Sequence, residues 1–214
     1  MASLDRKKWI IAVTGASGMP YAITLLQKLS LIQQTVEVDV IFSDAALRVL
    51  ADEMGVKTSH ANLRACLTEL GVSDSFLVHN PKDIGAKPAS GTALYQGMVI
   101  CPCSMGTLAA VSAGLSQNLI HRAADVTLKE QRKLIVAPRE TPLSLIHLRN
   151  MTTLAEMGAL ILPTMPGFYL QPETIQDLVD TVVHKIMDHM DLALEDAPRW
   201  AGKVASMPGQ GMLV

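Results

Sequence analysis

Two short turns rich in small residues have the composition of a phosphate-binding site. The first, TGASG at residues 14–18, follows an apolar run and precedes a helical pattern. Strand, small-residue turn and helix together present free backbone N–H groups to an anion. The second, CSMGT at residues 103–107, offers Ser104 and Thr107 within residues 88–120, which contain no charged side chain. The sequence predicts an anion or cofactor site at each turn, with ordinary helix capping by Ser104 as the alternative for the second.

Cations, a phenol and a carboxylate in the second half have the chemistry to handle a phosphate. Arg139 and Glu140 come directly after an apolar run, and Lys129, Tyr169 and Lys185 lie near other predicted element ends. Cations and a phenol satisfy phosphate oxygens, and a carboxyl group donates or accepts a proton. A solvated surface charge is the alternative for each residue taken singly. The adjacency of Arg139 and Glu140 at a strand end favours a shared phosphate site for all five.

The first turn fits a dinucleotide poorly. Its two glycines, Gly15 and Gly18, do not make the spacing G-x-G-x-x-G, and no lysine of the nucleotide-binding P-loop type follows. TGASG also opens many short-chain dehydrogenases, which need a Tyr-x-x-x-Lys pair. Leu25, Val99 and Glu173 stand at the lysine position after the three tyrosines. The sequence therefore disfavours a nicotinamide reductase.

Alternating strands and helices must position these turns. Apolar or alternating runs predict strands near residues 8–14, 36–42, 97–102, 133–138 and 158–163. Helical periodicity predicts helices near 19–33, 44–54, 60–70, 105–114, 119–130, 143–157 and 172–191. Residues 80–92 read as a long loop. The expected fold is α/β: a doubly wound, mostly parallel, Rossmann-like sheet in three flavodoxin-like layers, with ligands outside the carboxyl ends of the strands.

Composition bounds the function further. The 214 residues suit a single domain over 1–214 with a C-terminal tail from about 195. A net charge of −2 gives no electrostatic case for nucleic acid or an anionic membrane, and no apolar run is long enough to span a bilayer. Three cysteines make a poor disulfide framework, and no signal-peptide core precedes the first strand, so we expect a cytoplasmic protein. With 49% hydrophobic and 18% charged residues, we also expect a homo-oligomer.

Motifs along nearly the whole chain resemble the UbiX-like flavin prenyltransferases, flavoproteins formerly described as aromatic-acid or 3-polyprenyl-4-hydroxybenzoate decarboxylases. The matching segments are TGASG (14–18), PASG (88–91), MVICPCSMGTL (98–108), RAADVTLKE (122–130), APRETP (137–142), HLRNM (147–151), PGFY (166–169) and RW (199–200). TGASG alone is a weak signal, whereas the set is highly specific.

The resemblance implies a transferase that joins a dimethylallyl group to N5 and C6 of reduced FMN. Dimethylallyl monophosphate is the usual donor, and a diphosphate donor stays open. The prenylated FMN serves a separate UbiD-like decarboxylase. The resemblance implies no metal, and the chain has no Asp-rich metal motif. Protein cations must then stabilise the departing phosphate. The resemblance also implies closed homo-oligomers, commonly dodecamers, with cofactor sites at subunit junctions.

The resemblance assigns roles residue by residue. FMN is held by Gly15, Ala16, Ser17, Ser43, Ser104, Met105, Gly106, Thr107 and Arg139. The substrate-binding residues are Ala89, Ser90, Gly91, Lys129, Arg139, Glu140, Tyr169, Lys185 and Trp200. Among them, Lys129, Arg139, Tyr169 and Lys185 match the prenyl-phosphate positions, and Trp200 is expected to face the allylic cation. The catalytic residues are Ser17, Glu53, Lys129 and Glu140: Glu140 assists phosphate departure, and Ser17 with Glu53 manages protons at the flavin. Glu53 is expected to reach a flavin bound mainly by a neighbouring subunit.

Two departures from the family pattern concern the donor end of the site. Many relatives have arginine where Lys185 stands, which exchanges a planar fork for a point charge. Some carry an aromatic residue before the PASG loop, where this chain has Ile84. Two alternatives remain beside the transferase: an FMN-dependent cysteine-type decarboxylase, whose loop would read more like PASANT, and a non-catalytic flavin-binding subunit.

Overall fold

Six parallel strands form one sheet in the order β3-β2-β1-β4-β5-β6. The computed structural model describes residues 6–195, 197 and 199. The strands are β1 Lys7–Val13, β2 Val36–Phe42, β3 Leu77–His79, β4 Gly97–Cys103, β5 Lys133–Pro138 and β6 Leu160–Ile161. The helices are α1 Met19–Leu31, α2 Asp44–Met54, α3 Leu63–Glu69, α4 Met105–Ser112, α5 Leu119–Lys129, α6 Leu145–Glu156 and α7 Ile175–His189. This strand order is the Rossmann order, so the expected doubly wound α/β fold is confirmed.

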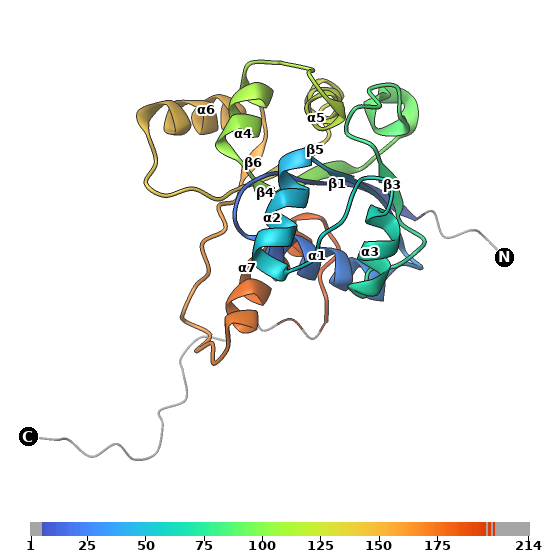
Figure 1. Cartoon of the computed structure of the whole chain (residues 1–214). Coiled ribbons are helices and arrows are strands. Elements are labelled where there is room, and N and C mark those ends of the chain that lie inside the picture. The colour runs from blue at the N-terminus through green and yellow to red at the C-terminus, as the bar shows by residue number, and fades with distance from the viewer. Residues whose placement is uncertain (1–5, 196, 198, 200–214) are drawn as a thin grey trace, which may run out of the picture.

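Helices cover both faces of the sheet, because the strands are apolar on both faces. Along β1, Trp9 and Ile11 enter one core, and Ile10 and Ala12 enter the other. The first core is closed by α1, α2, α3 and α7, and the second by α4, α5 and α6. Figure 1 shows α1, α3 and α7 on one side of the strands and α4, α5 and α6 on the other. No helix in the described part of the chain is long and apolar enough to cross a membrane.

The predicted elements are confirmed except along the segment after α3. Strand β3 was not predicted, because Leu77–His79 is a three-residue edge strand with only part of its surface covered. The predicted loop at 80–92 contains the short 3₁₀ turn Lys87–Ala89, and a second such turn, Gly91–Ala93, follows it. Trp200 and most of the predicted tail from about 195 lie outside the described residues.

The Thr14 side chain ties the ends of the two central strands together. Its hydroxyl donates a hydrogen bond to the Pro102 carbonyl over 2.8 Å and accepts one from the Ser104 N–H over 2.7 Å. The Thr14 N–H also donates to the Pro102 carbonyl, over 3.2 Å. Thr14 is only 1% exposed. One buried residue therefore fixes the turn after β1 against the turn after β4.

We expect Thr14→Val to lower the free energy of unfolding by about 1–3 kcal/mol, because the part-buried Ser104 N–H loses its acceptor. Denaturant unfolding monitored by circular dichroism measures the change. Thr127→Val is the matched control: Thr127 is also buried, but its hydroxyl donates only to Ala123 within its own helix. The control should cost under about 1 kcal/mol. Equal losses in the two variants would contradict a special role for Thr14.

Candidate functional site

The turns that follow four strands gather the predicted cofactor residues at one edge of the sheet. Because the strands are parallel, their carboxyl ends share that edge, and β1 and β4 flank the point where the strand order reverses. A Cβ atom on Gly15 would overlap Ala45, so glycine lets the turn after β1 lie against the start of α2. Ser43 caps α2 there by accepting the Ala46 N–H over 3.1 Å. The predicted residues at this edge are Gly15, Ala16, Ser17, Ser43, Ser104, Met105, Gly106, Thr107, Arg139 and Glu140.

The start of α4 is an open anion position. Ser104 caps the helix by accepting the Thr107 N–H over 3.3 Å. Within the described residues, no acceptor faces the N–H groups of Met105 and Gly106, which are the first two of the helix. Space is open beside Gly106, where a Cβ atom would meet nothing within 4 Å. The predicted capping is confirmed, and the N–H groups that it leaves open suit a phosphate or flavin.

The start of α1, in contrast, is already occupied by a carboxylate. Glu53, near the end of α2, accepts the Gly18 N–H over 3.0 Å and the Met19 N–H over 2.7 Å. These are two of the N–H groups that the sequence offers to a ligand phosphate. Glu53 was expected to reach a flavin held mainly by a neighbouring subunit, whereas the structure places its carboxylate on the TGASG turn of its own chain.

The Glu53 carboxylate is stabilised in its charged form. Burial acts to raise the pKa of Glu53, but hydrogen bonds from Ser17, Met19 and Gly18 and the charge of Arg139 outweigh it and lower the pKa below its usual value. The Arg139 guanidinium also donates from Nε to the Ser17 carbonyl over 3.0 Å. The residues Ser17, Glu53 and Arg139, predicted from distant segments, are thus brought into one network.

Glu140 lies exposed beside this network. Its Oε1 accepts the N–H of Thr141 over 3.0 Å, which holds the carboxylate close to the chain just after β5. Arg139 and Glu140 therefore stand at the same edge as the two turns. A carboxyl group here is accessible to a ligand and free to exchange protons with it.

Lys129 and the PASG loop meet at the opposite edge of the sheet. Lys129 ends α5 just before β5 begins, and Ala89, Ser90 and Gly91 precede β4. Lys129 forms an ion pair with Glu130, and a Cβ atom on Gly91 would lie 3.2 Å from the Lys129 ammonium.

The loop is held by a residue that the sequence analysis missed. Arg132, just before β5, donates a hydrogen bond to the Gly91 carbonyl. Nothing in the sequence distinguishes this arginine from a solvated surface charge. Lys129 and the PASG loop are thus neighbours in the structure, and their role stays a prediction.

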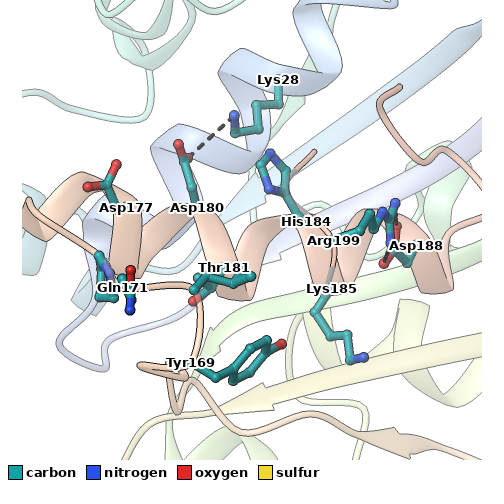
Figure 2. Close-up of a pocket in the computed structure, with 12 residues that line it drawn as sticks. Lys28, Tyr169, Gln171, Asp177, Asp180, Thr181, His184, Lys185, Asp188 and Arg199 are labelled. Carbon is teal, nitrogen blue, oxygen red and sulfur yellow. Dashed lines mark hydrogen bonds and ion pairs between the residues drawn. The ribbon is translucent and has the colours of Figure 1, made fainter. Parts of the chain in front are cut away.

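Tyr169 and Lys185 share a third location beside α7. They line a pocket of about 510 Å³ together with Lys28, Asp188 and Arg199. Figure 2 shows the Tyr169 ring and the Lys185 ammonium on the same side of the helix. Arg139, Lys129, Tyr169 and Lys185 were expected to converge on one phosphate. A single chain does not bring them together, because the sheet separates Lys129 from Arg139 and neither of them lines the pocket beside α7.

The two cysteines of β4, Cys101 and Cys103, offer no exposed nucleophile. Burial raises the pKa of Cys101 to about 12 and raises that of Cys103 further still. Both side chains are fully buried, so neither thiol meets a ligand as a thiolate. This finding disfavours a mechanism through either thiol. The described residues also contain no group of three or more His, Cys, Asp or Glu side chains arranged to hold a metal ion.

Comparison with known proteins agrees with this arrangement. The family model named Flavoprotein matches residues 2–187. The flavin prenyltransferase UbiX of Pseudomonas aeruginosa is 46% identical over 194 residues, which cover 89% of this chain and 92% of that protein.

Solved structures show the same fold over nearly the whole chain. A dodecameric FMN-dependent UbiX-like decarboxylase from Escherichia coli O157:H7 superimposes with a TM-score of 0.83 at 41% identity, covering 91% of this chain and all of that one. AnUbiX (PadA1) in complex with FMN and dimethylallyl pyrophosphate gives a TM-score of 0.83 at 39% identity, covering 93% of this chain and all of that one. With such identity over such lengths, the chain belongs to the flavoprotein family, among the UbiX-like flavin prenyltransferases.

Proposed function

We propose that this protein transfers the dimethylallyl group of dimethylallyl monophosphate to N5 and C6 of reduced FMN. The observation that carries the proposal is the cradle at the carboxyl ends of β1 and β4, where Ser17, Glu53 and Arg139 form one network beside the open start of α4. Relatives with 39–46% identity are named for this activity or were solved with FMN and a prenyl diphosphate. The direct test is an anaerobic assay with reduced FMN and dimethylallyl monophosphate, followed by mass spectrometry of the flavin.

The cofactor end of the site uses backbone donors. Reduced FMN supplies the electron-rich N5 and C6 atoms that accept the dimethylallyl group. The N–H groups of Met105 and Gly106 bind its phosphate, and Ser43 and the Gly15–Ser17 turn flank it. Ser17 holds and moves a proton near the flavin ring, with Glu53 as its hydrogen-bond partner.

The donor end uses cations in place of a metal. Lys129, Arg139 and Lys185 neutralise the phosphate as it leaves, and the Tyr169 hydroxyl donates a hydrogen bond to it, which lowers the transition-state energy where charge develops. Glu140 holds the proton that assists its departure, and Ala89–Gly91 shape the wall of the site. Trp200, which lies outside the described residues, remains the residue that the resemblance assigns to the allylic cation. Lys185, as a point charge, requires less exact orientation than an arginine fork.

A complete site requires several subunits, so we propose a homo-oligomer, with the dodecamer as the family's assembly. The split of the donor residues between three locations of one chain supports it. So does the exposed apolar surface: in α6 only Leu154 is buried, while Leu145 and Ile146 are 61% and 57% exposed. Phe168 in the loop before α7 is 71% exposed. Side chains of this kind normally lie in an interface.

The setting of the reaction follows from the family and the sequence. The product is passed to a UbiD-like decarboxylase, which requires prenylated FMN. Residues 1–214 act as one flavin-binding prenyltransferase domain, supported by the single sheet that joins both cores. The protein works in the cytoplasm, in keeping with its three unpaired, buried cysteines.

We expect Glu140→Gln to slow prenyl transfer by about 100-fold or more, because glutamine cannot supply the proton. The Oε1 atom that accepts the Thr141 N–H is retained, so FMN affinity should change little. Single-turnover assays and FMN titration measure the two quantities. Glu69→Gln, at the end of α3, is the control and should behave as wild type. Parallel loss of FMN binding and transfer would assign Glu140 a structural role.

We also expect prenyl transfer to be lost when the assembly dissociates, since one chain lacks a complete donor site. The molar mass from light scattering and the activity per milligram of protein should fall together over a dilution series, at fixed FMN and donor concentrations. Reconcentrating the diluted protein should restore both the molar mass and the activity per milligram. A stable monomer of 23.0 kDa with full activity would contradict the proposal.

A further inference from the structure

Three carboxylates line the pocket beside α7, yet one of its two lysines, Lys185, forms no ion pair with any of them. Asp177, Asp180 and Asp188 line the same pocket as Lys185. Among the described residues, no carboxylate forms an ion pair with the exposed Lys185 ammonium. The other partners of these three acids therefore determine how far the Lys185 ammonium is available to a ligand.

Two of the acids are engaged by groups away from Lys185. Asp177 Oδ2 accepts the N–H groups of Glu173 and Thr174 over 3.0 and 2.8 Å and so closes the first turn of α7. Asp180 pairs with Lys28 of α1 over 3.4 Å. Figure 2 shows that pair on the far side of α7 from Lys185.

Asp188 is the acid that competes for Lys185. It follows Lys185 by three positions in α7, and residues three apart on a helix are neighbours on its surface. Arg199, from the segment after the helix, donates hydrogen bonds to both carboxylate oxygens of Asp188: Nη1 lies 2.5 Å from Oδ2 and Nη2 lies 2.7 Å from Oδ1. This two-pronged pairing leaves the carboxylate little capacity for a second cation.

We propose that Arg199 is a positioning residue for the prenyl phosphate, acting by occupying Asp188 so that the Lys185 ammonium is available to the phosphate. The proposal rests on the proposed function for the identity of the anion, and on the geometry for the roles of the two side chains. Without Arg199, the free Asp188 carboxylate draws Lys185 into an ion pair along the helix. The phosphate then has to break that pair to bind.

The test is the affinity of FMN-loaded protein for dimethylallyl monophosphate and for inorganic phosphate, measured by titration calorimetry. We expect Arg199→Gln to raise both dissociation constants about fivefold, the effect of one partly exposed ion pair. Adding Asp188→Asn to Arg199→Gln should restore affinity to within about twofold of wild type, because the competing carboxylate is gone. This rescue distinguishes charge release from direct contact or from simple anchoring of the C-terminal segment, which the second change would not repair.

Arg6→Gln is the matched control, since Arg6 pairs with Glu37 over 3.0 Å at the amino-terminal edge of the sheet. It should leave both affinities unchanged. A double variant that binds as weakly as Arg199→Gln, or an Arg199→Gln variant that binds as wild type, overturns the proposal. Should Arg199→Gln fail to assemble, Asp188→Asn alone decides: affinity equal to or above wild type supports it, and a fivefold loss overturns it.

The two proposals fail separately. If the variants show the expected loss and rescue of binding but wild-type protein forms no prenylated FMN, the proposed function is refuted and the role of Arg199 is left intact. Prenylating protein that lacks the rescue would refute only the role of Arg199. Protein that binds neither anion would overturn this inference directly.

Discussion

The site depends on one buried hydroxyl group. Thr14 bonds to Pro102 and to Ser104, and so joins the turns after β1 and β4 at the point where the strand order reverses. Parallel sheets open a crevice at such a point, because neighbouring connections leave in opposite directions. The hydroxyl both donates and accepts, which a hydrocarbon of the same shape cannot do. Most of the predicted cofactor residues lie on these two turns, while Ser43 and Arg139 follow β2 and β5.

Charge is distributed unevenly between the helix starts around that crevice. The start of α1 carries the Glu53 carboxylate, while the first N–H groups of α4 meet no acceptor in the described part of the chain. A helix start attracts one anion strongly, so an internal carboxylate directs a ligand phosphate to the other helix. Arg139 then lies between them, bonded to the Ser17 carbonyl and close enough to Glu53 to lower its pKa. The arrangement separates the phosphate position from the group that handles protons.

The sheet itself keeps the donor-binding residues apart. Lys129 ends a helix and therefore lies at the edge where the strands begin, whereas Arg139 follows a strand and lies at the other. No rearrangement of side chains brings two edges of one sheet together. Assembly of several copies is the physical route to a single site, and the exposed apolar residues of α6 and the loop before α7 are consistent with it.

By itself the sequence determined the elements, the doubly wound fold and the turns that form the cofactor cradle. Strand and helix periodicities are local, and TGASG and CSMGT follow apolar runs whose ends must meet at one edge of a parallel sheet. Strand β3 was not predicted, because three residues are too few to show an alternating pattern of apolar and polar side chains. Only the tertiary structure decided that Glu53 occupies the start of α1, that Lys129 and Arg139 lie at opposite edges of the sheet, and that Arg199 pairs with Asp188. These are contacts between segments distant in the chain, and they depend on three-dimensional distances that residue types and spacing do not encode.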